Sequence, residues 1–148
     1  MIIFLATPIS SFKTDEEYDM YRKRVIQFIT LLRKEHQVQS EIEKVESEND
    51  YDSPAESFTR DLSAIQNCDA FIFHYPIPSP TSALIELGIA LALKKIVIII
   101  APSKRQLPYL VQGIDNIGTS FLLVENKHLG KTTAKNIIDF LEKQKQSS

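Results

Sequence analysis

Residues 69–75 read DAFIFHY and residues 96–100 read IVIII, and these two apolar runs determine the class of fold. Uninterrupted apolar runs of about four to eight residues are typical of strands that are buried on both faces, as in a parallel sheet. A third run, over Ile2–Ala6, has the same character. Two weaker strands are expected: a polar one over Val38–Val45, which suits a sheet edge, and a last one over Ser120–Val124.

Helices are expected between these strands. Residues 14–17 (TDEE) and 53–56 (SPAE) both match a capping box, in which the first and last residues satisfy each other's free backbone donors. Apolar residues recur at helical spacing after each box, to about His36 in the first case and as far as Ile65 in the second. Three further helices are predicted over Thr81–Leu93, Arg105–Gly113 and Thr133–Lys143. The first of these three is apolar almost all round, so it should be buried.

Five strands that alternate with five helices predict a parallel sheet covered on both faces, with right-handed crossovers. We therefore expect an α/β fold of the flavodoxin-like type, a three-layer sandwich with strand order 2-1-3-4-5, as a single domain over residues 1–148. Ligands of such folds bind beyond the carboxyl ends of the strands, where the strand order reverses. In this chain that position corresponds to the loops Thr7–Lys13 and Tyr75–Thr81.

The composition indicates an ordinary globular chain and excludes some partners. Seventeen basic and nineteen acidic residues give a formal net charge of -2, which offers no global field for a nucleic-acid backbone. The lone cysteine, Cys68, has no partner for an internal disulfide, and no export signal stands out, so the cytoplasm is expected. The most apolar stretch, Leu84–Ala101, contains Glu86, Lys94 and Lys95, which disfavour a membrane span. A buried helix followed by a buried strand is the better interpretation.

Glu86 is the most unusual side chain, because it stands in an otherwise apolar helix just after a proline-rich loop. A carboxylate in that setting is unfavourable unless it is paired, so a functional site is the first interpretation; a structural glutamate favoured by the helix dipole is the second. Asp61 by itself fits an ordinary solvated helix residue. His74, at the mouth of the third strand, either contacts a ligand or is an internally satisfied histidine. Residues 130–132 (GKT) lack the first glycine of a phosphate loop, and the histidines show no metal-ligand spacing.

Four stretches of the chain carry a family resemblance. Residues 3–9 (IFLATPI), 60–70 (RDLSAIQNCDA) and 78–90 (PSPTSALIELGIA) are the informative ones, and residues 102–113 follow more loosely. Together they resemble the nucleoside 2-deoxyribosyltransferase family, and within it the 2'-deoxynucleoside 5'-phosphate N-hydrolases. The resemblance covers the chain from residue 3 to about residue 113.

The resemblance implies a flavodoxin-like homodimer that cleaves the N-glycosidic bond of a nucleoside or nucleotide without a metal or an organic cofactor. Glu86 matches the glutamate that attacks the anomeric carbon, and Asp61 matches the aspartate that helps the base to leave. One carboxyl group must be ionised while the other keeps a proton, and the helix N-terminus should favour ionisation of Glu86. The candidate substrate contacts are Thr7, Ile9, Ser10, His74, Ser79 and Ser82.

Departures from the family pattern leave other functions open. Pro80 stands where many transferases have an aspartate, and Pro108 stands near the position of a phosphate-binding serine that the partner subunit supplies in the N-hydrolases. Transfer to a second base is therefore disfavoured. One alternative is a TIR-like NAD-cleaving enzyme, because DAFIFHY resembles the TIR opening strand, although here it is the third strand. The other is a non-catalytic nucleotide-binding or signalling module.

Overall fold

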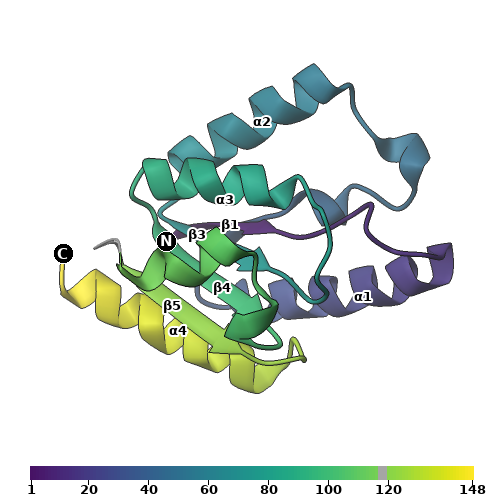
Figure 1. The fold of residues 1–148 in the computed structure, drawn as a ribbon. Coiled ribbons are helices and arrows are strands. Elements are labelled where there is room, and N and C mark those ends of the chain that lie inside the picture. The colour runs from purple at the N-terminus through teal and green to yellow at the C-terminus, as the bar shows by residue number, and fades with distance from the viewer. Residues whose placement is uncertain (117–119) are drawn as a thin grey trace.

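The computed structural model describes residues 1–116 and 120–148. The described strands form a five-stranded parallel sheet in the order β2-β1-β3-β4-β5, shown in Figure 1. The strands are β1 (Ile2–Ala6), β2 (Gln37–Gln39), β3 (Ala70–His74), β4 (Ile96–Ala101) and β5 (Phe121–Glu125). The predicted flavodoxin-like strand order is confirmed.

Helices cover both faces of the sheet, as Figure 1 shows. The helices are α1 (Asp15–Leu32), α2 (Pro54–Asn67), α3 (Ala83–Ala92) and α4 (Lys131–Gln146). Successive side chains along each strand point to opposite faces of the sheet. Phe4 and Phe71 pack beneath α2 and α3, whereas Leu5 and Ile72 pack against α1 and α4. These side chains are at most 1% exposed, and burying one such side chain contributes roughly 1.5–3 kcal/mol to folding.

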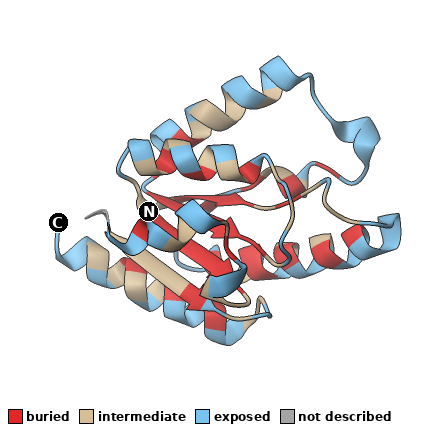
Figure 2. Cartoon of the chain, viewed as in Figure 1, coloured by how far each residue is buried: buried red, intermediate tan, exposed pale blue. Residues whose placement is uncertain are grey.

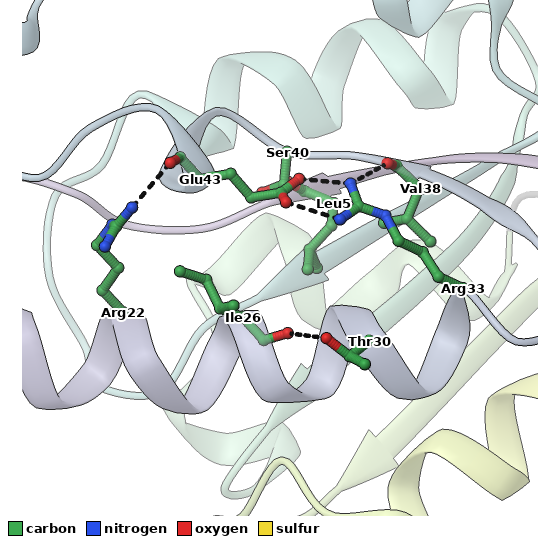
Figure 3. Close-up of polar contacts among 8 residues, drawn as sticks. All are labelled: Leu5, Arg22, Ile26, Thr30, Arg33, Val38, Ser40 and Glu43. Atoms are coloured by element: carbon green, nitrogen blue, oxygen red, sulfur yellow. Dashed lines mark hydrogen bonds and ion pairs between the residues drawn. The ribbon is translucent and has the colours of Figure 1, made fainter.

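The polar strand is shorter than predicted, because the chain turns back toward α1 after Gln39. Residues Glu41–Glu43 form a short 3-10 helix, η1, in place of the expected strand. Arg33 donates to the Val38 carbonyl and to both carboxylate oxygens of Glu43, and Arg22 donates to the Glu43 carbonyl (Figure 3). These bonds hold the end of η1 against α1, so the chain leaves the sheet edge here.

The helix predicted over Arg105–Gly113 is also different. The chain forms two 3-10 helices, η3 (Lys104–Gln106) and η4 (Tyr109–Asn116), with an extended residue, Leu107, between them. Pro108 is the cause, because proline supplies no N–H and disfavours the helical conformation in the residue before it.

At each of the two predicted capping boxes, the described structure contains only the hydrogen bond to the first residue of the box. Thr14 Oγ1 accepts a hydrogen bond from the Glu17 N–H at 3.1 Å, but the Glu17 carboxylate accepts from the N–H of Lys13, one residue before the cap. Ser53 Oγ accepts from the Glu56 N–H at 3.2 Å. The first helix ends at Leu32, short of the predicted His36.

Helix α3 is less buried than its composition predicts. Figure 2 shows buried, intermediate and exposed residues along α3. The buried residues of α3 are Ala83, Leu87 and Ala90, while Ile85 is 62% exposed. An outer layer buries only the helix face that meets the sheet, so α3 keeps an apolar face in solvent. Lys94, in the left-handed region with φ 56°, leads from α3 toward β4, which agrees with a helix followed by a strand. In the described residues no helix combines the length and the hydropathy that crossing a membrane requires.

Candidate active site

A pocket of about 300 Å³ opens beyond the carboxyl ends of β1 and β2, beside the first turn of α3 and one side of α2. The strand order reverses between β1 and β3, where the fold is expected to bind ligands. Of the two predicted ligand loops, the one after β1 contributes Thr7, Ile9 and Ser10 to the pocket, whereas the loop Tyr75–Thr81 contributes only Thr81. The structure brings six of the predicted site residues to this pocket: Thr7, Ile9, Ser10, Asp61, Ser82 and Glu86.

Two predicted contacts, Ser79 and His74, lie outside the pocket lining. The N–H of Ser79 donates to the Tyr75 hydroxyl at 2.9 Å, and its own hydroxyl donates to the carbonyl of Ile77. His74 is 3% exposed and faces α1, where its Nδ1 lies 2.7 Å from the Tyr21 hydroxyl and the two rings stack. Burial lowers the pKa of His74 to about 3, so the ring is neutral. Of the two interpretations of His74, the internally satisfied histidine fits this environment.

Glu86 occupies the first turn of α3, and its carboxyl group faces the pocket. Among the described residues, that carboxyl group has no hydrogen-bond or salt-bridge partner. Burial, with the negative charges of Asp61 and Glu41, raises the pKa of Glu86 from 4.5 to about 8. A helix dipole stabilises a nearby carboxylate by only about 0.3–1 kcal/mol, whereas the rise in the pKa of Glu86 corresponds to about 5 kcal/mol. Burial therefore outweighs the dipole. At neutral pH this pKa keeps the Glu86 carboxyl group mostly protonated, whereas the sequence predicts that it is ionised.

Asp61 lies on α2, and its side chain is 17% exposed. Burial and the charge of Glu41 raise the pKa of Asp61, while Arg60 opposes the shift. Asp61 Oδ1 lies 3.4 Å from Arg60 Nε, yet both atoms are buried without a hydrogen bond in the described structure. Two carboxyl groups with raised pKa values thus share one pocket, and the arrangement can retain a single proton between them.

Arg60 holds the walls of the pocket together. Its guanidinium pairs with Glu41 of η1 at 2.8 Å and with Asp52, which precedes α2. Three carboxylates therefore compete for this one cation. In the described lining the acidic side chains outnumber the basic ones, with Glu41, Asp50, Asp52, Asp61 and Glu86 against Lys44 and Arg60. The surplus of negative charge is one reason why the pKa values of both site carboxyl groups are raised.

The sequence did not indicate several of the lining residues. Glu41 and Lys44 fall within the strand predicted over Val38–Val45, and Tyr51 falls between that strand and the second capping box, where no element is predicted. Arg60 directly precedes Asp61, but successive residues of a helix do not face each other, so the sequence alone does not indicate its place in the pocket. In the part of the chain that the structure describes, no three His, Cys, Asp or Glu side chains are grouped as metal ligands would be.

Comparison with known proteins finds similarity in solved structures alone. No family model and no curated protein matches the chain. The chain superposes on the CMP N-glycosidase BcmB of Clostridium botulinum with a TM-score of 0.67 and 21% sequence identity, covering 93% of this chain and 98% of that one. A conserved protein from Enterococcus faecalis V583 gives a TM-score of 0.56 and 16% identity, covering 97% of this chain and 98% of that one. At sequence identities this low, the similarity shows only that the folds are alike, in agreement with the strand order.

Proposed function

We propose that this chain is an N-glycosidase that cleaves the base–sugar bond of a nucleoside or nucleoside monophosphate, with Glu86 as the nucleophile. The observation that carries the proposal is the Glu86 carboxyl group, which is largely buried, unpaired among the described residues and open to a pocket that it shares with Asp61. Strongly perturbed carboxyl groups in a pocket are typical of catalytic sites. The activity in the name of the similar BcmB structure supports the same reaction class.

In the proposed reaction, one proton is shared by the Glu86–Asp61 pair. With the proton on Asp61, the Glu86 carboxylate attacks C1' of the sugar, the C1'–N bond breaks, and the departing base takes the proton from Asp61. Water, deprotonated by Asp61, then hydrolyses the glycosyl ester. This step releases the sugar, frees the Glu86 carboxylate and returns the proton to the pair. Because the active form holds one proton, the rate should fall both at low pH, where both groups are protonated, and well above pH 8, where neither is.

The pocket offers polar groups for the rest of the substrate. The hydroxyl groups of Thr7, Ser10 and Ser82 line it without hydrogen-bond partners among the described residues, so they are available to sugar hydroxyls or a phosphate. Lys44 lines the same pocket and forms no ion pair within the described chain.

The test is direct. The protein is incubated separately with CMP, deoxynucleoside monophosphates, nucleosides and NAD, and free base is detected by chromatography, with Glu86→Gln as the matched control. Free base from nucleosides or monophosphates, absent with Glu86→Gln, is the expected result. Free nicotinamide from NAD alone would instead indicate a TIR-like enzyme, and no base from any compound would indicate a binding module.

We further propose that the chain forms a homodimer through its α2–α3 layer. Phe58 on α2 is 53% exposed and Ile85 on α3 is 62% exposed, on two helices that pack side by side (Figure 1). Exposed apolar side chains on one layer of a fold favour association. Sedimentation equilibrium should show a dimer for the wild-type chain and a monomer for Ile85→Glu; a wild-type monomer would contradict the proposal.

A further inference from the structure

Tyr51 is an aromatic residue of the pocket wall to which the proposed reaction gives no role. It follows the short 3-10 helix η2 (Glu48–Asp50), lines the pocket and is 48% exposed. Among the described residues, its ring stacks on no other aromatic ring and its hydroxyl forms no hydrogen bond. The other aromatic residue of the described lining, Phe4, is 1% exposed and is stacked on Phe71. Tyr51 thus presents a ring face that is not already occupied.

The backbone that carries this ring is held on both sides. The Asp50 carboxylate accepts hydrogen bonds from the backbone N–H groups of Glu46 at 2.9 Å and Ser47 at 3.1 Å. On the other side, Asp52 is paired with Arg60 of α2. The backbone on either side of Tyr51 is therefore anchored in the structure, and an anchored backbone leaves less entropy to lose on binding than a mobile one.

The same contacts put Tyr51 on the Asp61 side of the pocket. Arg60 pairs with Asp52, the residue after Tyr51, and its Nε lies 3.4 Å from Asp61 Oδ1. In the proposed reaction Asp61 gives its proton to the departing base, so the base must lie next to Asp61. A flat base has two π-faces, and a tyrosine ring provides a matching surface with few rotatable bonds.

We propose that the ring of Tyr51 stacks on the nucleobase of the substrate and so holds the base beside Asp61. This inference rests on the proposed N-glycosidase function, because that function places a base in this pocket. It assigns Tyr51 to substrate binding, with no part in proton transfer. The ring is what matters, and the hydroxyl is dispensable.

The test compares Tyr51→Ala with Tyr51→Phe in steady-state hydrolysis of CMP. Loss of a base–aromatic stack should raise the KM of Tyr51→Ala about 5- to 150-fold, with the change mainly in KM because the stack is present before and during bond cleavage. Tyr51→Phe should behave as the wild type. Met20→Ala, which truncates an exposed apolar side chain on α1 outside the pocket, is the matched control and should also behave as the wild type. An unchanged KM in Tyr51→Ala, or equal losses in Ala and Phe, would overturn the proposal.

A second measurement separates this proposal from the proposed function. Binding of CMP is measured by equilibrium dialysis in the Glu86→Gln background, with and without Tyr51→Ala, so that no ligand is consumed. If the wild-type chain releases no base, the glycosidase proposal fails, but weaker CMP binding in the Tyr51→Ala protein still supports stacking. Equal CMP binding with and without the ring overturns the stacking proposal, whatever the catalytic result.

Discussion

Two polar side chains at the carboxyl end of the sheet, His74 and Glu86, have opposite environments. His74 lies on the α1 side, where it is buried, hydrogen-bonded to Tyr21 and stacked on its ring. Glu86 lies on the α3 side, where it is also largely buried but has no polar partner among the described residues. A buried polar group without a partner destabilises the fold, and functional sites are a common place for such groups. The α1 side satisfies its polar groups internally, whereas the α3 side leaves a carboxyl group without a partner, as the proposed reaction requires.

Glu86→Gln should produce the largest change. We expect at least about a 1,000-fold loss of base release, because the amide cannot act as the nucleophile. The same substitution should stabilise the fold at high pH. Since the pKa of Glu86 is raised to about 8, the wild-type chain loses stability as the pH rises from about 4.5 to about 8, and a glutamine loses none.

Urea unfolding of both proteins at about pH 5 and about pH 9 checks the second effect. The difference in the free energy of unfolding should increase toward high pH, with an upper limit of about 5 kcal/mol. A difference that does not vary with pH would mean that the Glu86 carboxyl group is not perturbed in the folded state, and the contrast with His74 would fail.

Asp61→Asn should reduce base release from CMP by about 100- to 10,000-fold, the usual contribution of a general acid. A substrate whose base leaves without protonation, 7-methylguanosine monophosphate, serves as the control. Release of its base in the first turnover, before Asp61 is needed to deprotonate water, should be much less affected. Equal losses with both substrates would assign Asp61 a structural role and leave the proton of the leaving base without a donor.

The fold was far more predictable from the sequence than the site. Apolar runs such as residues 96–100 specify buried strands locally, and their alternation with helices restricts the topology. The protonation of Glu86 was not predictable, because it depends on burial and on Asp61 and Glu41, which only the folded chain brings near. The 3-10 helix η1, which carries Glu41, is held by Arg22 of α1 and by Arg33 at the end of α1. These contacts join residues that only the tertiary fold brings together.

His74→Phe tests the other half of the comparison, with an expected effect of a few kcal/mol. Burial lowers the pKa of His74 from 6.5 to about 3, so the wild-type chain loses stability as the pH falls through this window, while a phenylalanine does not. At neutral pH the variant should be about 1–3 kcal/mol less stable, because the buried Tyr21 hydroxyl loses its partner.

Urea unfolding of His74→Phe, Tyr21→Phe and the double variant forms a double-mutant cycle for this pair. The double variant should recover part of the loss, since it leaves no unpaired hydroxyl. Additive losses would show that the His74–Tyr21 bond contributes no coupling energy. The α1 side would then be stable through packing alone.

His36 should give the smallest effect, and it probes whether an unpaired polar group always marks a functional site. This residue, at the amino end of β2, is 6% exposed, and both ring nitrogens are buried without a hydrogen bond in the described structure. Burial and the charge of the N-terminal amine lower the pKa of His36, so acid should destabilise the fold through this ring as the pH falls below about 6.5. His36→Leu should therefore raise the free energy of unfolding by about 1 kcal/mol at neutral pH, and by more in acid, without changing base release. Base release that falls with His36→Leu would mean that the amino end of the sheet contributes to function, and that the unpaired groups of this chain belong to one extended site.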